Sequence, residues 1–569
     1  MRYKQAILVV RFLFSVLVAG LFYFQVVRGE HFLRLSRNNV IRVVSFDAAR
    51  GRIFDRNGVV LADTIASHAV SVIPQEIKDE RRLFYRLSEL LDISAGQLYR
   101  NYQRNYANPF TPVKVMSRLD KEALIRIEEN KIDLPGVIVE VVPERVYPYK
   151  EAAAHVLGYL GKIDLSQITR LRPYGYQASD VIGYNGIEAY YDLFLRGTKG
   201  GEQVEVDNRS RKVRTVGYKP AQPGHDIRIS LDMGVQEVVD EAMGDQEGVV
   251  ILMEAQSGEI IAMSSKPAYD PEIFVQGDSR RIAEVFAAAG SPLLNRAIAG
   301  MYSPGSVFKI VTSAAALEKD HRLIHSVFEC NSRLKIGDRY FHCLSTHGAE
   351  NMREAFMHSC NVYFYNLGFL VGPDLMAQQA RSLGLGEKTG VDLKYEARGI
   401  VPSPHWKSLI RFKKWFRGDT ANMSIGQGDV LVTPLQMVRM AAVFANGGLL
   451  VQPHFIKAIG DKDIALRRNR GVALSKEALQ SIASFLEQTV KNPEGTAHAV
   501  AIEGLIVAGK TGTTQITGKD AHGWFVGYVG AEEPRYAFCV FLEHSGSSHY
   551  ACVLAQKIFE ELKRKNLLS

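Results

Sequence analysis

The chain has 569 residues, of which 46% are hydrophobic and 23% charged, and its formal net charge is +8 at pH 7. This composition is typical of a globular protein and excludes a disordered one, and the length predicts two or three domains. No run of Lys and Arg in the body of the chain predicts a nucleic-acid-binding element, so we expect no nucleic-acid partner.

An apolar stretch near the N-terminus, residues 6–27, is interrupted only by Arg11 and by the uncharged Ser15 and Gln25. As a helix it is long enough to cross a hydrocarbon core of about 30 Å. A cleavable signal peptide is the alternative, but no small-x-small cleavage site follows the stretch. We therefore expect one uncleaved transmembrane helix at residues 6–27. Cations lie on both sides of it, so charge alone does not predict its orientation.

Residues 43–225 are predicted to form a non-catalytic pedestal module, because this region contains no metal-ligand or nucleotide-binding motif. Its local patterns predict a hairpin over residues 52–63 with Asn57-Gly58 at the turn, helices over 81–91 and 121–130, and a strand over 136–142.

Residues 226–569 show a different pattern, in which short strands precede and follow a long helical region. The expected strands are residues 249–253, 260–264, 505–514, 524–530 and 536–543. Turn signals join consecutive strands, which indicates antiparallel pairing. We therefore expect an α+β domain in which helices surround an antiparallel sheet.

The first chemical motif is Ser306-Val307-Phe308-Lys309, which follows Pro304 and Gly305 and is predicted to open a helix that runs to about Glu318. Residues i and i+3 share a helix face, so Lys309 can reach Ser306. A buried lysine with a lowered pKa can act as the base that activates a serine nucleophile. The alternative is an N-cap serine with a surface lysine, since Ser-x-x-Lys is common by chance.

Two more elements follow in order along the chain. Ser359-Cys360-Asn361 lies within residues 355–370 and on its own could be a polar patch on a helix. Lys510-Thr511-Gly512-Thr513 lies in a predicted strand, where an open edge can pair with an extended substrate and Gly512 permits close approach of its backbone. On its own it could be a strand that ends in a turn. Together, the three elements are the signature of penicillin-binding proteins and serine β-lactamases.

The chain resembles class B penicillin-binding proteins over nearly its whole length. The resemblance rests on residues 50–58, 186–188, 295–297, 424–428, 433–436 and 522–528 in addition to the three elements. His347-Gly348, residues 359–365 and residues 401–406 resemble the elongation type, the penicillin-binding protein 2 group. Ser303, Glu254 and residues 545–550 depart from the family pattern, and the last departure bears on the C-terminal rim of the cleft.

The resemblance implies a peptidoglycan D,D-transpeptidase that is inhibited by β-lactam antibiotics. Lys309 would deprotonate Ser306, which attacks the bond between two D-alanines of a stem peptide; Ser359 would relay a proton and Asn361 would bind the substrate amide. Lys510, Thr511 and Thr513, with Gly512 between them, would hold the terminal carboxylate. The backbone N–H groups of Ser306 and Thr513 would form the oxyanion hole. No cofactor is expected for catalysis.

The resemblance also implies stem peptides and lipid-linked precursor glycan as substrates, and a SEDS-family glycan polymerase and shape-maintaining scaffold proteins as partners. Because peptidoglycan lies outside the cytoplasmic membrane, residues 1–5 would be cytoplasmic and the domain at residues 226–569 would lie on the periplasmic side. The alternatives are a division-type transpeptidase, a penicillin-binding sensor or scaffold, and a secreted β-lactamase. A β-lactamase would lack the segment before residue 226 and would need a deacylating base that we do not find.

A cysteine–histidine cluster is the last feature of the sequence. Cys330, Cys343, His347 and Cys360 have the spacing C-x12-C-x3-H-x12-C. Three thiols and one imidazole are the ligand set of a closed structural zinc site. The alternatives are a Cys330–Cys343 disulfide and a Cys360 that is a small buried core residue. Since Cys360 lies between Ser359 and Asn361, a metal bound there would fix the second catalytic element.

Overall fold

The computed structural model describes residues 2–32, 41–106, 109, 111–177, 180–206, 212–465 and 469–568. The chain divides into two compact units. The first unit comprises Met1–Arg50, Thr64–Glu144 and Arg196–Gly224; the second comprises Gly51–Asp63, Arg145–Leu195 and His225–Ser569. The second unit therefore includes two segments that precede residue 226.

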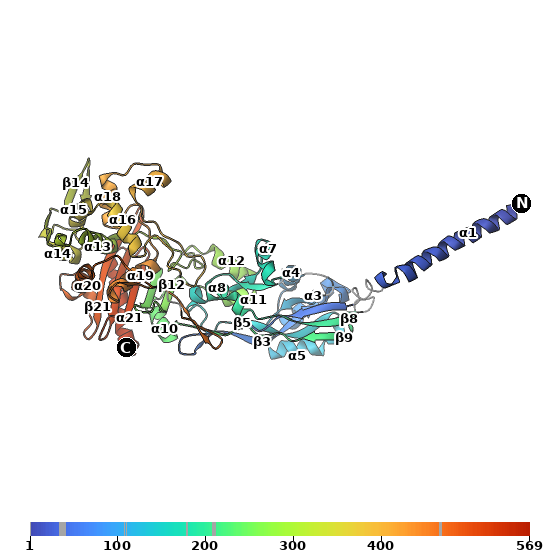
Figure 1. Ribbon diagram of the computed structural model, residues 1–569. Helices are drawn as coiled ribbons and strands as arrows, with labels where there is room; N and C mark the ends of the chain where they lie inside the picture. Colours follow the sequence, from blue (N-terminus) through green and yellow to red (C-terminus); the bar gives the residue numbers. More distant parts are fainter. Residues whose placement is uncertain are drawn as a thin grey trace. The chain divides into compact units, whose positions relative to one another are not determined.

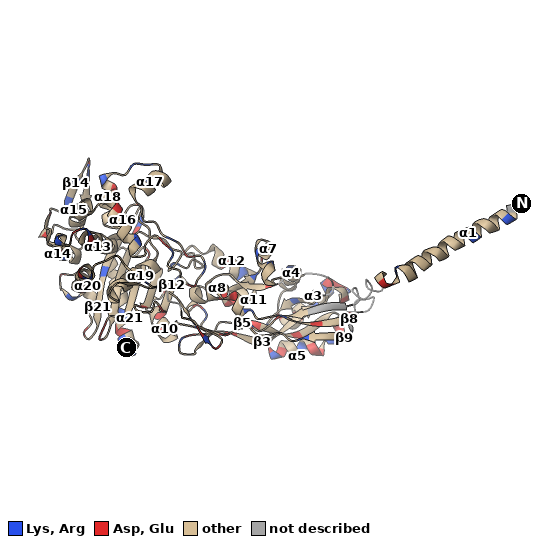
Figure 2. Ribbon diagram, in the orientation of Figure 1, with Lys and Arg blue, Asp and Glu red and all other residues tan. Residues whose placement is uncertain are grey.

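The first unit begins with α1 (Arg2–Phe22), which continues as one turn of π-helix over Tyr23–Val27. Residues Tyr3–Val27 have a mean hydropathy of 2.4 and are long and apolar enough to cross a membrane. Figure 2 shows how few charged residues α1 carries. The stretch at residues 6–27 that the sequence predicts to span the membrane lies within this helix.

The rest of the first unit is a mixed α/β module. Its elements are β1 (Ile41–Phe46), β3 (Val60–Val72) from residue 64 onward, α3 (Glu80–Leu91), α4 (Ala95–Asn105), β4 (Val113–Met116), α5 (Lys121–Glu129), β5 (Val137–Val146) up to residue 144, β8 (Gly200–Val206) and β9 (Lys212–Lys219). The helices begin at side-chain caps, because Asp79, Ser94 and Asp120 each accept a hydrogen bond from the first turn. Their apolar faces, including Leu87, Leu98 and Ile127, form one core with Val70 and Val113 of the strands. The two helices and the strand expected here are confirmed to within a few residues.

The second unit is built on a five-stranded antiparallel sheet in the order β12-β11-β23-β22-β21. Figure 1 labels its two outer strands, β12 and β21. The strands are β11 (Gly248–Glu254), β12 (Ile260–Lys266), β21 (Ile506–Ile516), β22 (Lys519–Gly530) and β23 (Tyr536–Leu542). Each of the five strands expected between residues 249 and 543 coincides with one of them. The expected α+β class is confirmed.

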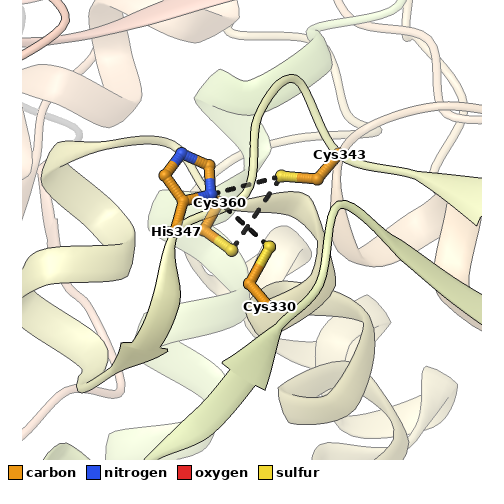
Figure 3. A group of neighbouring side chains, drawn as sticks. All are labelled: Cys330, Cys343, His347 and Cys360. Carbon is orange, nitrogen blue, oxygen red and sulfur yellow. Dashed lines mark hydrogen bonds between the residues drawn. The ribbon is translucent and has the colours of Figure 1, made fainter.

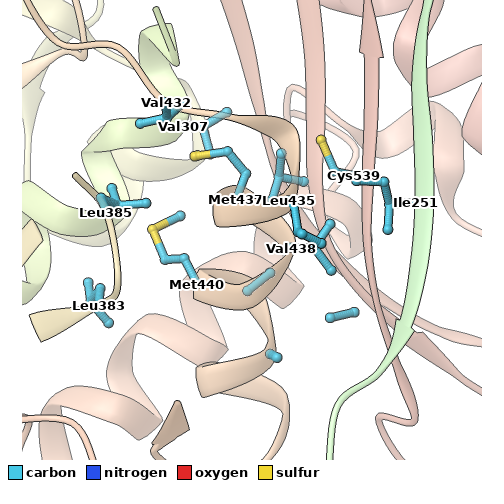
Figure 4. Close-up of a cluster of buried hydrophobic side chains, with 14 of the residues drawn as sticks. Ile251, Val307, Leu383, Leu385, Val432, Leu435, Met437, Val438, Met440 and Cys539 are labelled. Carbon is cyan, nitrogen blue, oxygen red and sulfur yellow. The ribbon is translucent and has the colours of Figure 1, made fainter. Parts of the chain in front are cut away.

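Both faces of this sheet are buried, which explains the almost unbroken apolar sequence of β11 and β23. Successive side chains of a strand point to opposite faces. Ile251 and Cys539 lie in the core beneath α19 (Pro434–Ala445), as Figure 4 shows, whereas Val250 and Phe538 lie in a second core on the other face. That second core includes residues of α10 (Met233–Met243) and α21 (Ser548–Arg564).

Helices and short strands are inserted between β12 and β21. The helices are α11 (Glu272–Gln276), α12 (Ser279–Ala287), α13 (Lys309–Lys319), α14 (Met352–Met357), α15 (Asn361–Val371), α16 (Pro373–Ser382), α17 (Pro404–Arg411), α18 (Arg417–Ser424) and α20 (Lys476–Lys491). The short strands β13 (Phe328–Cys330), β14 (Arg333–Ile336), β15 (Arg339–His342) and β16 (Gly348–Glu350) lie between α13 and α14.

The segments that precede residue 226 form a further part of the same unit. They contribute β2 (Ile53–Phe54), α6 (Ala154–Leu157), β6 (Leu160–Lys162), α7 (Leu165–Leu171), β7 (Val181–Gly183), α8 (Gly186–Tyr190) and α9 (Asp192–Leu195). The hairpin expected over residues 52–63 is confirmed, because Ile53 pairs with Ala62 in antiparallel register. β2 also pairs in parallel with β10 (Ile227–Ile229), which pairs with β18 (Ile456–Ile459).

Candidate active site and metal centre

Ser306 lies in a turn of 3-10 helix, Gly305–Phe308, that leads into α13. The sequence predicts an α-helix that opens at Ser306, but the α-helix begins at Lys309. The tighter turn places residues i and i+3 directly above one another, so Ser306 and Lys309 still share a face. Gly305 has a φ of +54°, and its N–H donates to the Gly426 carbonyl at 3.0 Å. The left-handed backbone at this position favours glycine.

Lys309 is fully buried and brings the second element to the first. Its Nζ donates hydrogen bonds to the carbonyl oxygen of Ser359 at 2.6 Å, to Ser359 Oγ at 3.1 Å and to Asn361 Oδ1 at 2.8 Å. The ammonium also lies 5.2 Å from the centre of the Phe364 ring. Burial lowers the pKa of Lys309 to about 8. A lysine with such a pKa can accept a proton near neutral pH.

Ser359 lies in a break between two helices rather than within one. α14 ends at Met357 and α15 begins at Asn361, and Ser359 has a φ of +58°. A left-handed conformation is uncommon for a residue other than glycine and is typical of functional sites. Cys360 is the N-cap of α15, and its Sγ accepts a hydrogen bond from the Tyr363 N–H at 3.4 Å. The break turns the side chains of both Ser359 and Asn361 toward Lys309.

The third element lies on β21, the terminal strand of the sheet. A Cβ added at Gly512 would lie 2.8 Å from the Pro304 carbonyl oxygen and 2.8 Å from Val307 Cγ2. Glycine therefore lets β21 pack directly on the turn that holds Ser306. Burial, and to a smaller extent the charge of Lys309, lowers the pKa of Lys510 well below its ordinary value. The structure thus brings Lys510 and Gly512 to the first two elements.

Residues that the three motifs do not include support the third element. Thr513 Oγ1 donates to Ser548 Oγ at 3.1 Å, and Thr511 Oγ1 donates to Thr496 Oγ1 at 2.8 Å. The carbonyl of Ser303 accepts hydrogen bonds from Thr514 Oγ1 and Trp524 Nε1 at 2.8 and 3.1 Å. Ser548 falls in residues 545–550, which depart from the family pattern. That departure is the signal by which the sequence could have indicated Ser548. No local signal in the sequence points to Thr496.

The cysteine–histidine cluster, drawn in Figure 3, includes Cys360, the residue that follows Ser359 in the chain. Cys330 ends β13, Cys343 follows β15, His347 precedes β16 and Cys360 caps α15. Their ligand atoms all lie within 4.8 Å of one another. His347 Nδ1 is 3.5 Å from Cys330 Sγ and 3.6 Å from Cys343 Sγ, and the Sγ atoms of Cys343 and Cys360 are 4.0 Å apart. The four predicted ligands thus converge on one point.

The chemistry of this cluster fits a metal better than a disulfide. A disulfide bond is about 2 Å long, and the structure leaves all five cysteines free, against the alternative of a Cys330–Cys343 bond. The side-chain contact with Cys360, whose Sγ lies 4.0 Å away, lowers the pKa of Cys343 and so favours the thiolate that a metal requires. The His347 ring is oriented by Ser345 Oγ, 3.0 Å from Nε2, which leaves Nδ1 directed at the thiols. Three sulfurs and one nitrogen are the ligands that zinc prefers.

Two family models match the chain. Residues 248–563 match the penicillin binding protein transpeptidase domain, and residues 45–229 match the penicillin-binding protein dimerisation domain. The peptidoglycan D,D-transpeptidase MrdA of Acinetobacter baumannii is 31% identical over 576 residues, which cover 96% of this chain and 85% of that protein.

Solved structures agree with the sequence matches. Penicillin-binding protein 2 of Helicobacter pylori, solved in complex with MreC, has a TM-score of 0.81 at 27% identity and covers 93% of this chain and 99% of its own. A chain from a peptidoglycan synthase complex that coordinates polymerization and crosslinking has a TM-score of 0.71 at 28% identity, covering 98% of this chain and 97% of its own.

Proposed function

Since this chain belongs to the transpeptidase family of penicillin-binding proteins, we propose that Ser306 is the nucleophile with which it cross-links peptidoglycan. The protein is a peptidoglycan D,D-transpeptidase of the elongation type, the penicillin-binding protein 2 group. The assignment of Ser306 rests on one observation. Lys309, one helical turn after Ser306, hydrogen-bonds both Ser359 Oγ and Asn361 Oδ1.

In the proposed reaction, Lys309 takes the hydroxyl proton of Ser306, and Oγ attacks the carbonyl carbon between two D-alanines of a donor stem peptide. Backbone N–H groups of Ser306 and Thr513 stabilise the oxyanion. When the amide bond breaks, Ser359 relays the proton from Lys309 to the leaving D-alanine, and an ester to Ser306 remains. The amine of a second stem peptide then attacks the ester, forms the new amide and returns a proton to Ser306.

The remaining site residues bind the donor in this scheme. Asn361 positions the amide of the donor, and Lys510, Thr511 and Thr513 hold its terminal carboxylate. The glycine at position 512 supports the assignment, because it allows the third element to lie against the Ser306 turn. β-Lactams acylate Ser306 in place of the donor, and the acyl-enzyme hydrolyses slowly.

Mass mapping of a penicillin adduct tests the assignment of the nucleophile. We expect one adduct per chain, on the peptide that contains Ser306, and no labelling of Ser306→Ala although that variant unfolds at the wild-type temperature. An adduct on another serine, or undiminished labelling of Ser306→Ala, would reject the assignment.

We also propose that Cys330, Cys343, His347 and Cys360 hold a structural zinc ion. The support is the ligand set and the mutual distances within 4.8 Å. Bound zinc would supply a rigid cross-link and no catalytic chemistry. Cys343 and Cys360 both touch the start of α15, so the four residues would hold Asn361 in position.

The arrangement in the cell follows from the same assignment. We propose that the helix over Tyr3–Val27 anchors the protein in the cytoplasmic membrane, with residues 1–5 inside and the transpeptidase domain, residues 226–569, outside. Residues 43–225 would be the non-catalytic pedestal. A SEDS-family glycan polymerase and shape-maintaining scaffold proteins are the proposed partners, supported by the relatives solved with MreC and in a peptidoglycan synthase complex.

A further inference from the structure

A short hairpin, β14–β15, leaves the cysteine–histidine cluster and returns to it. Cys330 lies three residues before β14, and Cys343 directly follows β15, where its N–H donates to the Ser332 carbonyl at 2.7 Å. One face of the hairpin, formed by Leu334, Ile336 and Phe341, packs against the core of the second unit. The hairpin is therefore held at its base and along one face.

The other face of the hairpin is cationic and exposed. Arg333 and Lys335 are two residues apart and point to the same side, and Tyr340 is the direct cross-strand partner of Lys335. The Arg333 guanidinium lies 4.7 Å and the Lys335 ammonium 6.0 Å from the centre of the Tyr340 ring. No ion pair to Arg333 or Lys335 is present in the part of the chain that the structure describes.

Two like charges fixed around one aromatic ring create a site for an anion. The ring orients both cations by cation–π contact and so reduces the entropy that an anion must overcome to bind them. Repulsion between the cations is unfavourable until a negative group lies near both. The chemistry of this face therefore suits a carboxylate near Arg333 and Lys335.

The hairpin borders the proposed active site. The carbonyl of His342, its last residue, accepts hydrogen bonds from Asn361 Nδ2 at 3.2 Å and from Tyr365 at 3.3 Å. A Cβ added at Gly418 of α18 would lie 3.2 Å from the Phe341 ring. The exposed Arg417, next to Gly418 in the chain, adds positive charge, whereas Asp419 and Asp429 are paired with Lys407 and Arg411.

We propose that the outer face of β14–β15 binds the carboxylates of the acceptor stem peptide, the second peptide of the cross-linking reaction. The proposal rests on the proposed function and extends it to the second substrate. The donor carboxylate is already assigned to β21, which packs on the Ser306 turn through Gly512, whereas the hairpin approaches Asn361 through α15 and α18. An acidic peptide on the hairpin would therefore lie beside the acyl-enzyme without displacing the donor.

The test uses the full chain in detergent, an acyl-D-alanyl-D-alanine peptide as donor and a disaccharide-tetrapeptide as acceptor. We expect Arg333→Gln/Lys335→Gln to raise the KM for the acceptor about tenfold, from two exposed charge contacts. Penicillin acylation should stay at the wild-type rate. The matched control Lys476→Gln/Lys557→Gln removes two exposed cations from α20 and α21 and should change neither quantity.

A second acceptor, whose carboxylates are amidated, identifies the group that is recognised. For the wild type, the KM for the amidated acceptor should be about as high as the KM of the double variant for the acidic acceptor. For the amidated acceptor, the double variant should have no higher KM than the wild type. The proposal would be overturned if the double variant had the wild-type KM for the acidic acceptor, or if its KM rose by the same factor for both acceptors. If the double variant folds poorly, Lys335→Gln alone is measured, and it should raise the KM for the acidic acceptor by a smaller factor. Failure of the wild type to acylate at Ser306 would instead reject the proposed function.

Discussion

The backbone N–H of Asn361 donates a hydrogen bond to the Sγ of Cys343 across 3.2 Å. This contact joins the cysteine–histidine cluster to a residue that also accepts a hydrogen bond from Lys309. An N–H···S bond of this kind stabilises a thiolate, which is the protonation state that binds a metal. The position of Asn361 and the charge of Cys343 are therefore coupled.

Removal of one ligand should remove the metal. We expect about one zinc per chain by elemental analysis, and its loss in Cys343→Ser and in His347→Ala. The free energy of unfolding should fall by about 3 kcal/mol or more, because the metal binds only the folded chain. Cys552→Ala is the matched control, since this buried cysteine lies outside the cluster and its loss should leave the zinc in place. Metal-free protein with a Cys330–Cys343 disulfide by mass spectrometry would contradict the site.

Replacement of Lys309 should abolish most of the acylation. Lys309→Ala removes the proposed general base, so penicillin acylation should slow by at least about 10²-fold in stopped-flow or gel-based labelling. Lys319→Ala, at the exposed end of the same helix, should acylate at the wild-type rate. A near-normal rate in Lys309→Ala would make this lysine structural.

Acylation should increase with pH. Burial lowers the pKa of Lys309 to about 8, and only the neutral amine can accept the proton of Ser306. Roughly one tenth of Lys309 is neutral at pH 7, so the second-order rate constant for penicillin should rise through pH 8 and level off above it. A flat profile between pH 6 and pH 9 would show that this proton transfer does not limit acylation.

The contact between β21 and the Ser306 turn should tolerate no side chain. Gly512→Ala places a methyl group 2.8 Å from the Pro304 carbonyl and should destabilise the fold by about 1–3 kcal/mol while slowing acylation. Gly471→Ala is the control, because no atom lies within 4 Å of its added Cβ. Thermal unfolding and penicillin labelling check both variants, and wild-type behaviour of Gly512→Ala would mean that the strand can shift.

Removal of the N-terminal helix should release the protein from the membrane. A chain that begins at His31 should be soluble and should still bind penicillin, because Tyr3–Val27 is the one candidate span in the described residues. Retention in the membrane fraction after high-salt and alkaline washing would reveal a second membrane contact.

Much of the second unit could be predicted from the sequence, because its signals are local. The five strands are apolar runs bounded by turns, and Lys510-Thr511-Gly512 and Ser306-Val307-Phe308-Lys309 are recognisable wherever they fold. The break at Ser359 could not be predicted, since residues 355–370 have helical composition and only tertiary contacts hold Ser359 at a φ of +58°. The contact between Lys309 and Ser359 spans 50 residues, and periodicity contains no information about such pairs.

β21 ends the sheet, so one row of its backbone N–H and C=O groups has no strand partner among the residues described. An extended inhibitor that pairs with this row would be recognised mainly through main-chain atoms. Side-chain substitutions leave those atoms in place, and only proline removes an N–H. Resistance through this strand would therefore require either a proline or a movement of the strand, which its close packing on Pro304 and Val307 opposes.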